Sequence, residues 1–349
     1  MERKRINLAL QGGGAHGAFA WGVLDRLLDE DWLEIGGVSG TSAGALNAAA
    51  LKAGLAVARG DRGRQAAREN LDAVWSAVGE VSENRMVRWM ASLFPVPRGF
   101  QRVTEMFSPI AWLEGVTRVF SPYDYGPFYT NPLSEIVTAM PHGDFTAPGG
   151  PRLFVSATNV RSGRVRVFTG ADLSVRAVLA SACLPTLFRA IEIDDPETGQ
   201  PEAYWDGGYS ANPALFPLFA PSLPRDIVIV NINPWHRDDL PKTPVDIQNR
   251  INEISFNASL QRELRAINFV KRLFDEGRLD DGGMKDVLVH MIFDDHLMTD
   301  LSARSKVMPG PGLLTRMKAA GQDAADRWLA EHADALGQRD TVDLPSLFG

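Results

Sequence analysis

The turn at residues 38–47 constrains the fold of this chain more than any other stretch. It reads Val-Ser-Gly-Thr-Ser-Ala-Gly-Ala-Leu-Asn, which places Ser42 at the centre of a G-x-S-x-G pattern. An apolar run (33–38) precedes it and a run of helix formers (43–55) follows, so the pattern predicts a strand, a sharp turn and a helix. A serine on such a turn projects from the backbone beside a helix N-terminus, which favours negative charge. Ser42 is therefore the candidate nucleophile, although a plain strand-helix turn rich in small residues also fits so short a pattern.

The neighbours of Ser42 are small, as a tight turn that admits a substrate carbonyl requires. The candidate elbow consists of Gly40, Thr41, Ala43 and Gly44 around the serine.

A second glycine-rich turn follows the first predicted strand. The apolar run 6–10 ends in Gln-Gly-Gly-Gly-Ala-His-Gly, and apolar residues at helical spacing come next. Bare backbone amides on such a loop bind anions. We expect the N–H groups of Gly12, Gly13 and Gly14 to face Ser42 from the adjacent strand end and to form an oxyanion hole. His16, in the same loop, is expected to be a solvated first-turn residue or a supporting residue behind the site.

The glycine loop fits two other uses poorly. Gly12, Gly14 and Gly17 satisfy the G-x-G-x-x-G pattern of dinucleotide-binding folds, but no acidic residue ends the second predicted strand to bind a ribose. A Walker loop needs Gly-Lys-Ser/Thr, which this loop lacks.

Composition excludes several other classes of function. The chain has 349 residues, is 45% hydrophobic and carries a net charge of −7, so a nucleic-acid partner is not expected. The single cysteine, Cys183, allows no internal disulfide and is expected to be a small buried residue. No apolar stretch reaches the length of a signal peptide core or a membrane span, so we expect a cytoplasmic protein. Residues 294–296, Asp-Asp-His, are interpreted as a polar loop, and no metal site is expected.

The remaining pattern predicts an α/β domain. Helices are expected over 56–83, 177–183, 247–275 and 313–329, and strands over 152–159, 164–169, 191–193, 225–232 and 286–293. A turn-rich loop is expected over 194–201. Residues 85–132 are dense in aromatic residues, methionine and proline, and they form either a lid over the site or part of the core.

A third motif, Asp206-Gly207-Gly208, is a turn signal between aromatic residues. Together with Gly12–Gly17 and Gly40–Gly44 it resembles the patatin-like phospholipase family. The resemblance covers roughly residues 5–220, and the stretch from Trp235 to about Arg278 resembles the extra C-terminal region of one bacterial branch of the family, whose role the motifs do not imply. It implies a three-layer α/β/α fold with a mostly parallel central sheet, and lipid acyl hydrolysis without metal or cofactor. It also implies that Ser42 is the nucleophile, Asp206 the general base and Gly12 to Gly14 the oxyanion donors. The family often has Arg or Lys where His16 stands.

The chain is divided into three parts on this basis. Residues 5–220 are the expected catalytic region, 221–336 complete or pack on the same domain, and 337–349 form a weakly ordered tail. The oligomeric state is not predicted.

The sequence leaves two alternatives to a Ser-Asp lipid hydrolase open. One is an α/β-hydrolase esterase with a Ser-acid-His triad, whose histidine would be one of His236, His290, His296 and His332. Ser42 follows only two predicted strands, earlier than that fold places its nucleophile. The other is a non-catalytic lipid-binding scaffold. The expected partner is a lipid or acyl ester, reached at a membrane or lipid-granule surface, and phospholipid, neutral lipid, thioester and polyester substrates remain open.

Overall fold

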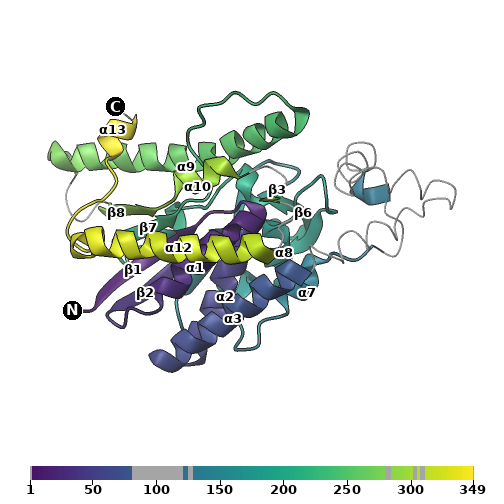
Figure 1. Ribbon diagram of the computed structural model, residues 1–349, viewed down its shortest axis with the longest axis horizontal. Coiled ribbons are helices and arrows are strands. Elements are labelled where there is room, and N and C mark those ends of the chain that lie inside the picture. Colours follow the sequence, from purple (N-terminus) through teal and green to yellow (C-terminus); the bar gives the residue numbers. More distant parts are fainter. Residues whose placement is uncertain are drawn as a thin grey trace.

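An eight-stranded sheet forms the centre of the protein in the computed structural model (Figure 1), which describes residues 2–80, 121–124, 129–279, 284–301, 305–306 and 311–348. The strands are β1 (Lys4–Leu10), β2 (Leu33–Thr41), β3 (Arg152–Asn159), β4 (Val165–Thr169), β5 (Ile191–Asp195), β6 (Gln200–Asp206), β7 (Asp226–Val230) and β8 (Leu288–Ile292). Their order is β5-β6-β3-β2-β1-β7-β8, and β4 pairs with β3. The neighbouring strands β3, β2, β1, β7 and β8 are parallel to one another, whereas β4 and β6 run antiparallel to β3.

Helices connect and cover these strands. The longer ones are α1 (Ala18–Leu27), α2 (Ala43–Val57), α3 (Asp61–Glu80), α9 (Pro244–Asp275) and α12 (Pro311–His332). The shorter ones are α7 (Leu133–Val137), α8 (Val175–Ser181), α10 (Asp295–Asp300) and α13 (Leu344–Phe348), with 3-10 turns η1 (Gly14–Gly17), η3 (Pro122–Asp124), η4 (Gly170–Asp172), η5 (Gly207–Tyr209), η6 (Phe216–Phe219) and η7 (Ala333–Ala335).

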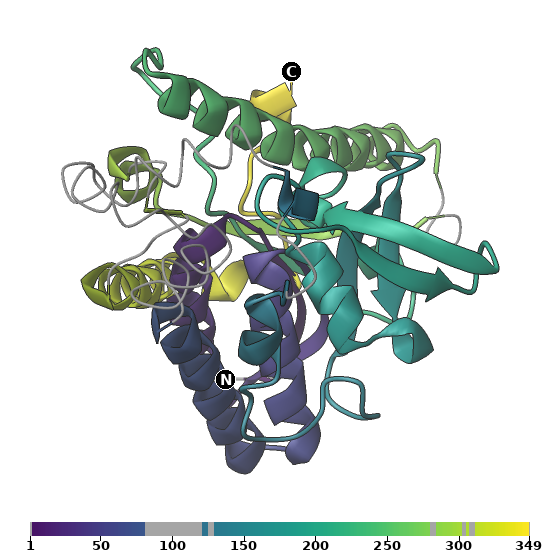
Figure 2. The same ribbon diagram turned by 90° about the vertical axis from the view of Figure 1, so that its right-hand side faces the viewer.

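The sheet is covered on both faces, as the alternation along β7 shows. Ile227 and Ile229 pack with residues of α9 and α13, whereas Val228 and Val230 pack with residues of α1, α2 and α12. Successive side chains of a strand point to opposite faces, so each face needs its own apolar layer. Figure 2 shows α9 on one side of the sheet and α2, α3 and α12 on the other. The protein therefore has the expected three-layer α/β/α architecture.

The parallel order brings several chain turns to one edge of the sheet. β1 ends before the glycine loop, β2 ends before Ser42, and β7 ends before residues 231–233. The carboxyl ends of neighbouring parallel strands lie side by side, which is where α/β proteins bind ligands.

The chain beyond residue 220 supplies β7 and β8 to the same sheet. The stretch after Gly337, expected to be a weakly ordered tail, contacts the sheet. The N–H groups of Thr341 and Val342 bond to the carbonyl of Val289, and Leu344 is buried in the layer that α9 shares with the sheet. The tail is held because it continues the pairing of β8 and buries an apolar side chain.

The aromatic region 85–132 lies mostly outside the described residues, so its role as lid or core stays a prediction. Among the described helices, none is both long enough and apolar enough to cross a membrane.

Candidate active site

Ser42 occupies the turn between β2 and α2 in a backbone conformation that L-residues rarely adopt. Its φ is 55° and its ψ is −123°, and it is the one non-glycine residue with positive φ in the described chain. Such a conformation costs free energy and persists only where the surroundings enforce it. The N–H of Ser42 donates to Oγ of Ser181 at 2.9 Å. Ser42 is the N-cap residue of α2, so it lies on a sharp turn between a strand and a helix.

The glycines around Ser42 are needed because backbone segments approach closely. A Cβ atom on Gly40 would clash with the carbonyl of Gly44, and one on Gly44 would clash with the carbonyl of Leu10. A Cβ on Gly12 would lie 2.5 Å from that of Ser42. Because these glycines have no Cβ atom, the glycine loop can pack directly on the elbow.

Asp206 lies at the end of β6 and contacts Ser42 directly. The Ser42 hydroxyl donates to Oδ2 of Asp206 at 2.7 Å, although 164 positions separate the two residues. Asp206 pairs with Ala157 of β3, and β3 pairs with β2, so the sheet order brings the carboxylate to the serine. Its other oxygen, Oδ1, accepts from the N–H of Gly208 at 2.8 Å.

The two glycines after Asp206 also have a packing reason. A Cβ on Gly207 would clash with the carbonyl of Ser156, and one on Gly208 would lie 2.8 Å from the ring of Phe256 in α9.

Asp206 is fully buried, and this sets its proton affinity. Burial raises the pKa of Asp206 to about 7, against hydrogen bonds from Ser42 and Gly208 that lower it. A carboxylate with a pKa near neutrality is a better proton acceptor than one with an ordinary value. The pair can therefore move a proton from a serine hydroxyl to a carboxylate without a third group.

The glycine loop faces this pair but differs from the expectation in one respect. The N–H of Gly12, expected to be an oxyanion donor, donates instead to Oδ1 of Asn212 at 2.6 Å. The amides of Gly13 and Gly14 have no hydrogen-bond partner among the described residues. Gly12 thus acts as an anchor of the loop.

Buried amide side chains fix the loop from the opposite side. Nδ2 of Asn212 donates to the Gly12 carbonyl at 3.1 Å, and Nδ2 of Asn233 donates to the same oxygen at 2.8 Å. Oε1 of Gln11 accepts from the backbone N–H of Ile232 and Asn233, at 2.9 and 3.1 Å. Asn257 of α9 then donates to the carbonyl of Asn233 at 3.3 Å. The residues after β7 and on α9 therefore set the position of the loop.

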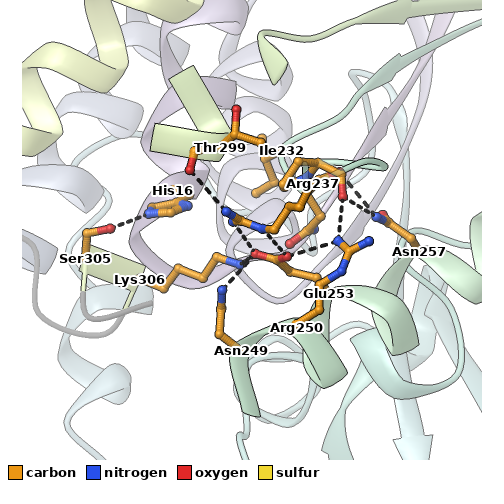
Figure 3. Close-up of polar contacts among 12 residues, drawn as sticks. His16, Ile232, Arg237, Asn249, Arg250, Glu253, Asn257, Thr299, Ser305 and Lys306 are labelled. Carbon is orange, nitrogen blue, oxygen red and sulfur yellow. Dashed lines mark hydrogen bonds and ion pairs between the residues drawn. The ribbon is translucent and has the colours of Figure 1, made fainter. Parts of the chain in front are cut away.

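A charged cluster centred on Glu253 of α9 adds to this support (Figure 3). Arg237 donates to both Glu253 oxygens at 2.8 Å, and Nζ of Lys306 donates to Oε1 at 2.9 Å. Arg250 and Asn249 complete the set of donors. Burial raises the pKa of Glu253, but Arg237 and Lys306 outweigh this effect and hold the pKa at about 2. The carboxylate is therefore charged and links α9 to the segment that carries Lys306.

His16 joins this cluster and is buried, not solvated as expected. It is 1% exposed, and its Nε2 bonds to Oγ of Ser305 at 2.8 Å. Burial, with the charge of Lys306, lowers the pKa of His16 to about 3. The imidazole is therefore neutral, and the positive charge beside the loop comes from Lys306 and Arg237.

No histidine takes the place of Asp206 as a base in the described chain. His290 bonds to Asp226 at 3.0 Å and His236 to Asp238 at 3.1 Å, both away from Ser42. Cys183 is buried, and burial raises the pKa of its thiol to about 12. Residues 294–296, expected to be a polar loop, instead form the N-terminus of α10, where Asp294 caps the helix by accepting from the N–H of Leu297. Within the described residues, no group of three or more His, Cys, Asp or Glu could hold a metal ion.

Comparison with protein families matches residues 8–219 to Patatin-like phospholipase. The chain belongs to this family. The matched stretch contains the glycine loop, the elbow and the Asp206 turn, and family membership implies a lipid acyl hydrolase.

Other comparisons add little to the family assignment. Among solved structures, the chain is similar to VipD from Legionella pneumophila, with 14% sequence identity and a TM-score of 0.42 over 94% of this chain and 67% of that chain. A search of curated proteins found no match.

The family match ends before β7, so much of the support for the glycine loop lies beyond it. Asn233, Arg237, Glu253 and Asn257 were not identified from the sequence, and Asn212 was overlooked inside the match. The sequence offers one indication of such residues, which is the presence of polar side chains directly after an apolar strand. Examples are Gln11 after β1 and residues 231 and 233 after β7.

Proposed function

We propose that this patatin-like protein hydrolyses lipid acyl esters through an acyl-enzyme on Ser42, with Asp206 as the general base. The observation that carries the proposal is the 2.7 Å hydrogen bond from Ser42 Oγ to a fully buried carboxylate. Serine needs a base within hydrogen-bond reach to become a nucleophile, and this carboxylate is in reach.

The reaction proceeds in two displacements. Ser42 Oγ attacks the acyl carbonyl carbon while its proton passes to Oδ2 of Asp206, and the carbonyl oxygen becomes negative. Collapse of this intermediate breaks the ester bond, and the departing alcohol takes the proton from Asp206. Water then attacks the acyl-enzyme, gives a proton to Asp206, and releases the fatty acid as Ser42 is protonated again.

The N–H groups of Gly13 and Gly14, with the N-terminus of α2, are the proposed oxyanion donors. Fixed donors aimed at a developing charge are commonly the largest catalytic contribution of a site. The anchoring of Gly12 by Asn212 and Asn233 supports this assignment, because it holds the two free amides in one place.

Replacing Gly14 with alanine is expected to lower kcat by ~10²-fold or more, the effect of losing one oxyanion donor. Gly14 has a φ of 60°, and a Cβ there would clash with the carbonyl of Lys306. The matched control is Gly163→Ala in the β3–β4 turn, where φ is 67° and no atom lies within 4 Å of the added carbon. Steady-state kinetics on a soluble ester should show the loss of kcat only for Gly14→Ala. Equal rates for the two variants would show that the amide of Gly14 is not an oxyanion donor.

Activity should rise with pH through about 7, because Asp206 must lose its proton before it can accept one from Ser42. Well below that pH, kcat/KM should fall about tenfold per unit, since only the deprotonated fraction reacts. The test is a pH profile on a neutral short-chain ester. An acidic limb near the ordinary pKa of aspartate would show that the buried carboxylate does not limit the rate.

Phospholipid is the substrate class we propose first, in a phospholipase A or lysophospholipase reaction, because it is the default of the family. Neutral lipids, thioesters and short polyesters would use the same residues. Turnover of a panel of these esters by the wild type and by Ser42→Ala would assign the class. We also propose a cytoplasmic location, which rests on the single buried cysteine.

A further inference from the structure

The outer face of α9 carries an exposed stripe of apolar and basic residues. Its members lie three, four or eight positions apart, spacings that place them on one side of the helix. They are Ile247, Ile251, Ile254, Arg262, Arg265, Phe269 and Arg272, and each is exposed. We call these seven residues the α9 stripe.

The first half of the α9 stripe is apolar to an unusual degree for a solvent-facing surface. Ile247, Ile251 and Ile254 are 43%, 50% and 56% exposed. Three isoleucines in consecutive turns form a continuous patch, unlike singly scattered apolar residues, which need no explanation.

The second half is basic up to Arg272, and Asp275 and Glu276 follow at the end of the helix, where Glu276 pairs with Arg278. Between positions 247 and 272 the acidic residues of α9 are Glu253 and Glu263. Glu253 is buried among its donors, and Glu263 accepts from the N–H groups of Leu215 and Phe216. Arg265 lies over the ring of Phe348 and forms no ion pair with the residues that the structure describes. A local excess of arginine in a chain of net charge −7 indicates an anionic counterpart.

The apolar half of the stripe adjoins the catalytic edge of the sheet. Phe256, on the inner side of the same turns, packs on Gly208 beside Asp206 and contacts the ring of Tyr209. Figure 1 shows α9 along the outside of the sheet, with α13 beside its C-terminal half, where Phe348 contacts Arg265.

We propose that the α9 stripe docks the protein on an anionic lipid bilayer. Ile247, Ile251 and Ile254 enter the boundary of the acyl chains, and the arginines contact lipid phosphates, as in helices that lie in the membrane interface. The proposal rests on the proposed function only in that the bilayer would hold the substrate. A second copy of the chain fits less well, because its own stripe offers the arginines no acidic partner.

The test is co-sedimentation of the full chain with vesicles of phosphatidylcholine, with and without phosphatidylglycerol. The wild type should bind the anionic vesicles and release at high salt. Changing the three isoleucines to Ser, or Arg262, Arg265 and Arg272 to Gln, should each weaken binding by about tenfold or more, given the contribution of each basic or apolar residue at a lipid surface. The single variant Ile254→Ser, at an exposed site, should weaken it in the same direction if a triple variant fails to fold.

The matched control changes an exposed apolar residue and two arginines at the opposite edge of the sheet: Val57→Ser, Arg59→Gln and Arg62→Gln. This variant should bind as the wild type does. Equal losses in control and stripe variants, or no vesicle binding by the wild type, would overturn the proposal. Self-association that the isoleucine variant loses would assign the stripe to a second copy instead. Turnover of a soluble ester separates the two claims: turnover without vesicle binding refutes docking alone, and binding without turnover refutes the hydrolase alone.

Discussion

Replacing Ser42 with alanine should reduce ester hydrolysis by about 10⁴-fold or more, the scale seen when a serine nucleophile is removed. The expectation follows from its place on the elbow and its hydrogen bond to Asp206. Alanine keeps the small side chain that the turn requires, so the fold should persist. The measurement is kcat/KM on a soluble ester, with circular dichroism to check folding.

The matched control is Ser39→Ala in β2, which removes a buried hydroxyl that donates to the Ala214 carbonyl at 2.6 Å. It should retain activity within about tenfold, because that hydroxyl takes no part in the chemistry and a change of ~1.4 kcal/mol is the ordinary limit for such effects. If Ser42→Ala hydrolysed the ester at a wild-type rate, another residue would have to be the nucleophile.

Replacing Asp206 with asparagine should lower turnover by ~10² to 10⁴-fold, the contribution of a general base. Asparagine nearly preserves the shape, and its side-chain oxygen can still accept from the N–H of Gly208. It cannot accept the proton of Ser42. The variant should also lose the pH dependence near 7 that Asp206 causes.

Histidine variants provide the comparison for this result. His236, His290, His296 and His332, the candidates for a Ser-acid-His triad, should each tolerate alanine with less than about tenfold loss of turnover, or ~1.4 kcal/mol. His290 is buried against Asp226, so its variant needs a folding check first. If one folded histidine variant lost its activity while Asp206→Asn stayed active, the Ser-acid-His triad would be the better account.

The elbow and the two glycine-rich turns could be predicted because local residues determine their geometry. Gly40 and Gly44 permit the tight turn, and the apolar runs on either side fix a strand and a helix. The meeting of Ser42 and Asp206 could not be derived from spacing. It depends on the pairing of β6 with β3, which lies beside β2. The sequence did not predict β6, because the strand begins in the stretch 194–201, whose composition favours a turn.

The support for the glycine loop was the part that sequence reasoning missed. The Gly12 amide was expected to bind the oxyanion, but Asn212 reaches it from 200 positions away. His16 was expected to be a solvated first-turn histidine, with a supporting role as the alternative, yet it is buried beside Ser305 and Lys306. Such contacts join distant parts of the chain, and only the assembled sheet shows which polar residues face each other.

The most direct measurement of the central claim is covalent labelling with a fluorophosphonate, followed by peptide mapping. A serine made nucleophilic by Asp206 should give one adduct, on Ser42. The labelling rate should rise with pH through about 7 and fall by ~10²-fold or more in Asp206→Asn, as expected when a general base is lost. An adduct on another residue, or labelling of Ser42 that Asp206→Asn leaves unchanged, would contradict the Ser-Asp dyad.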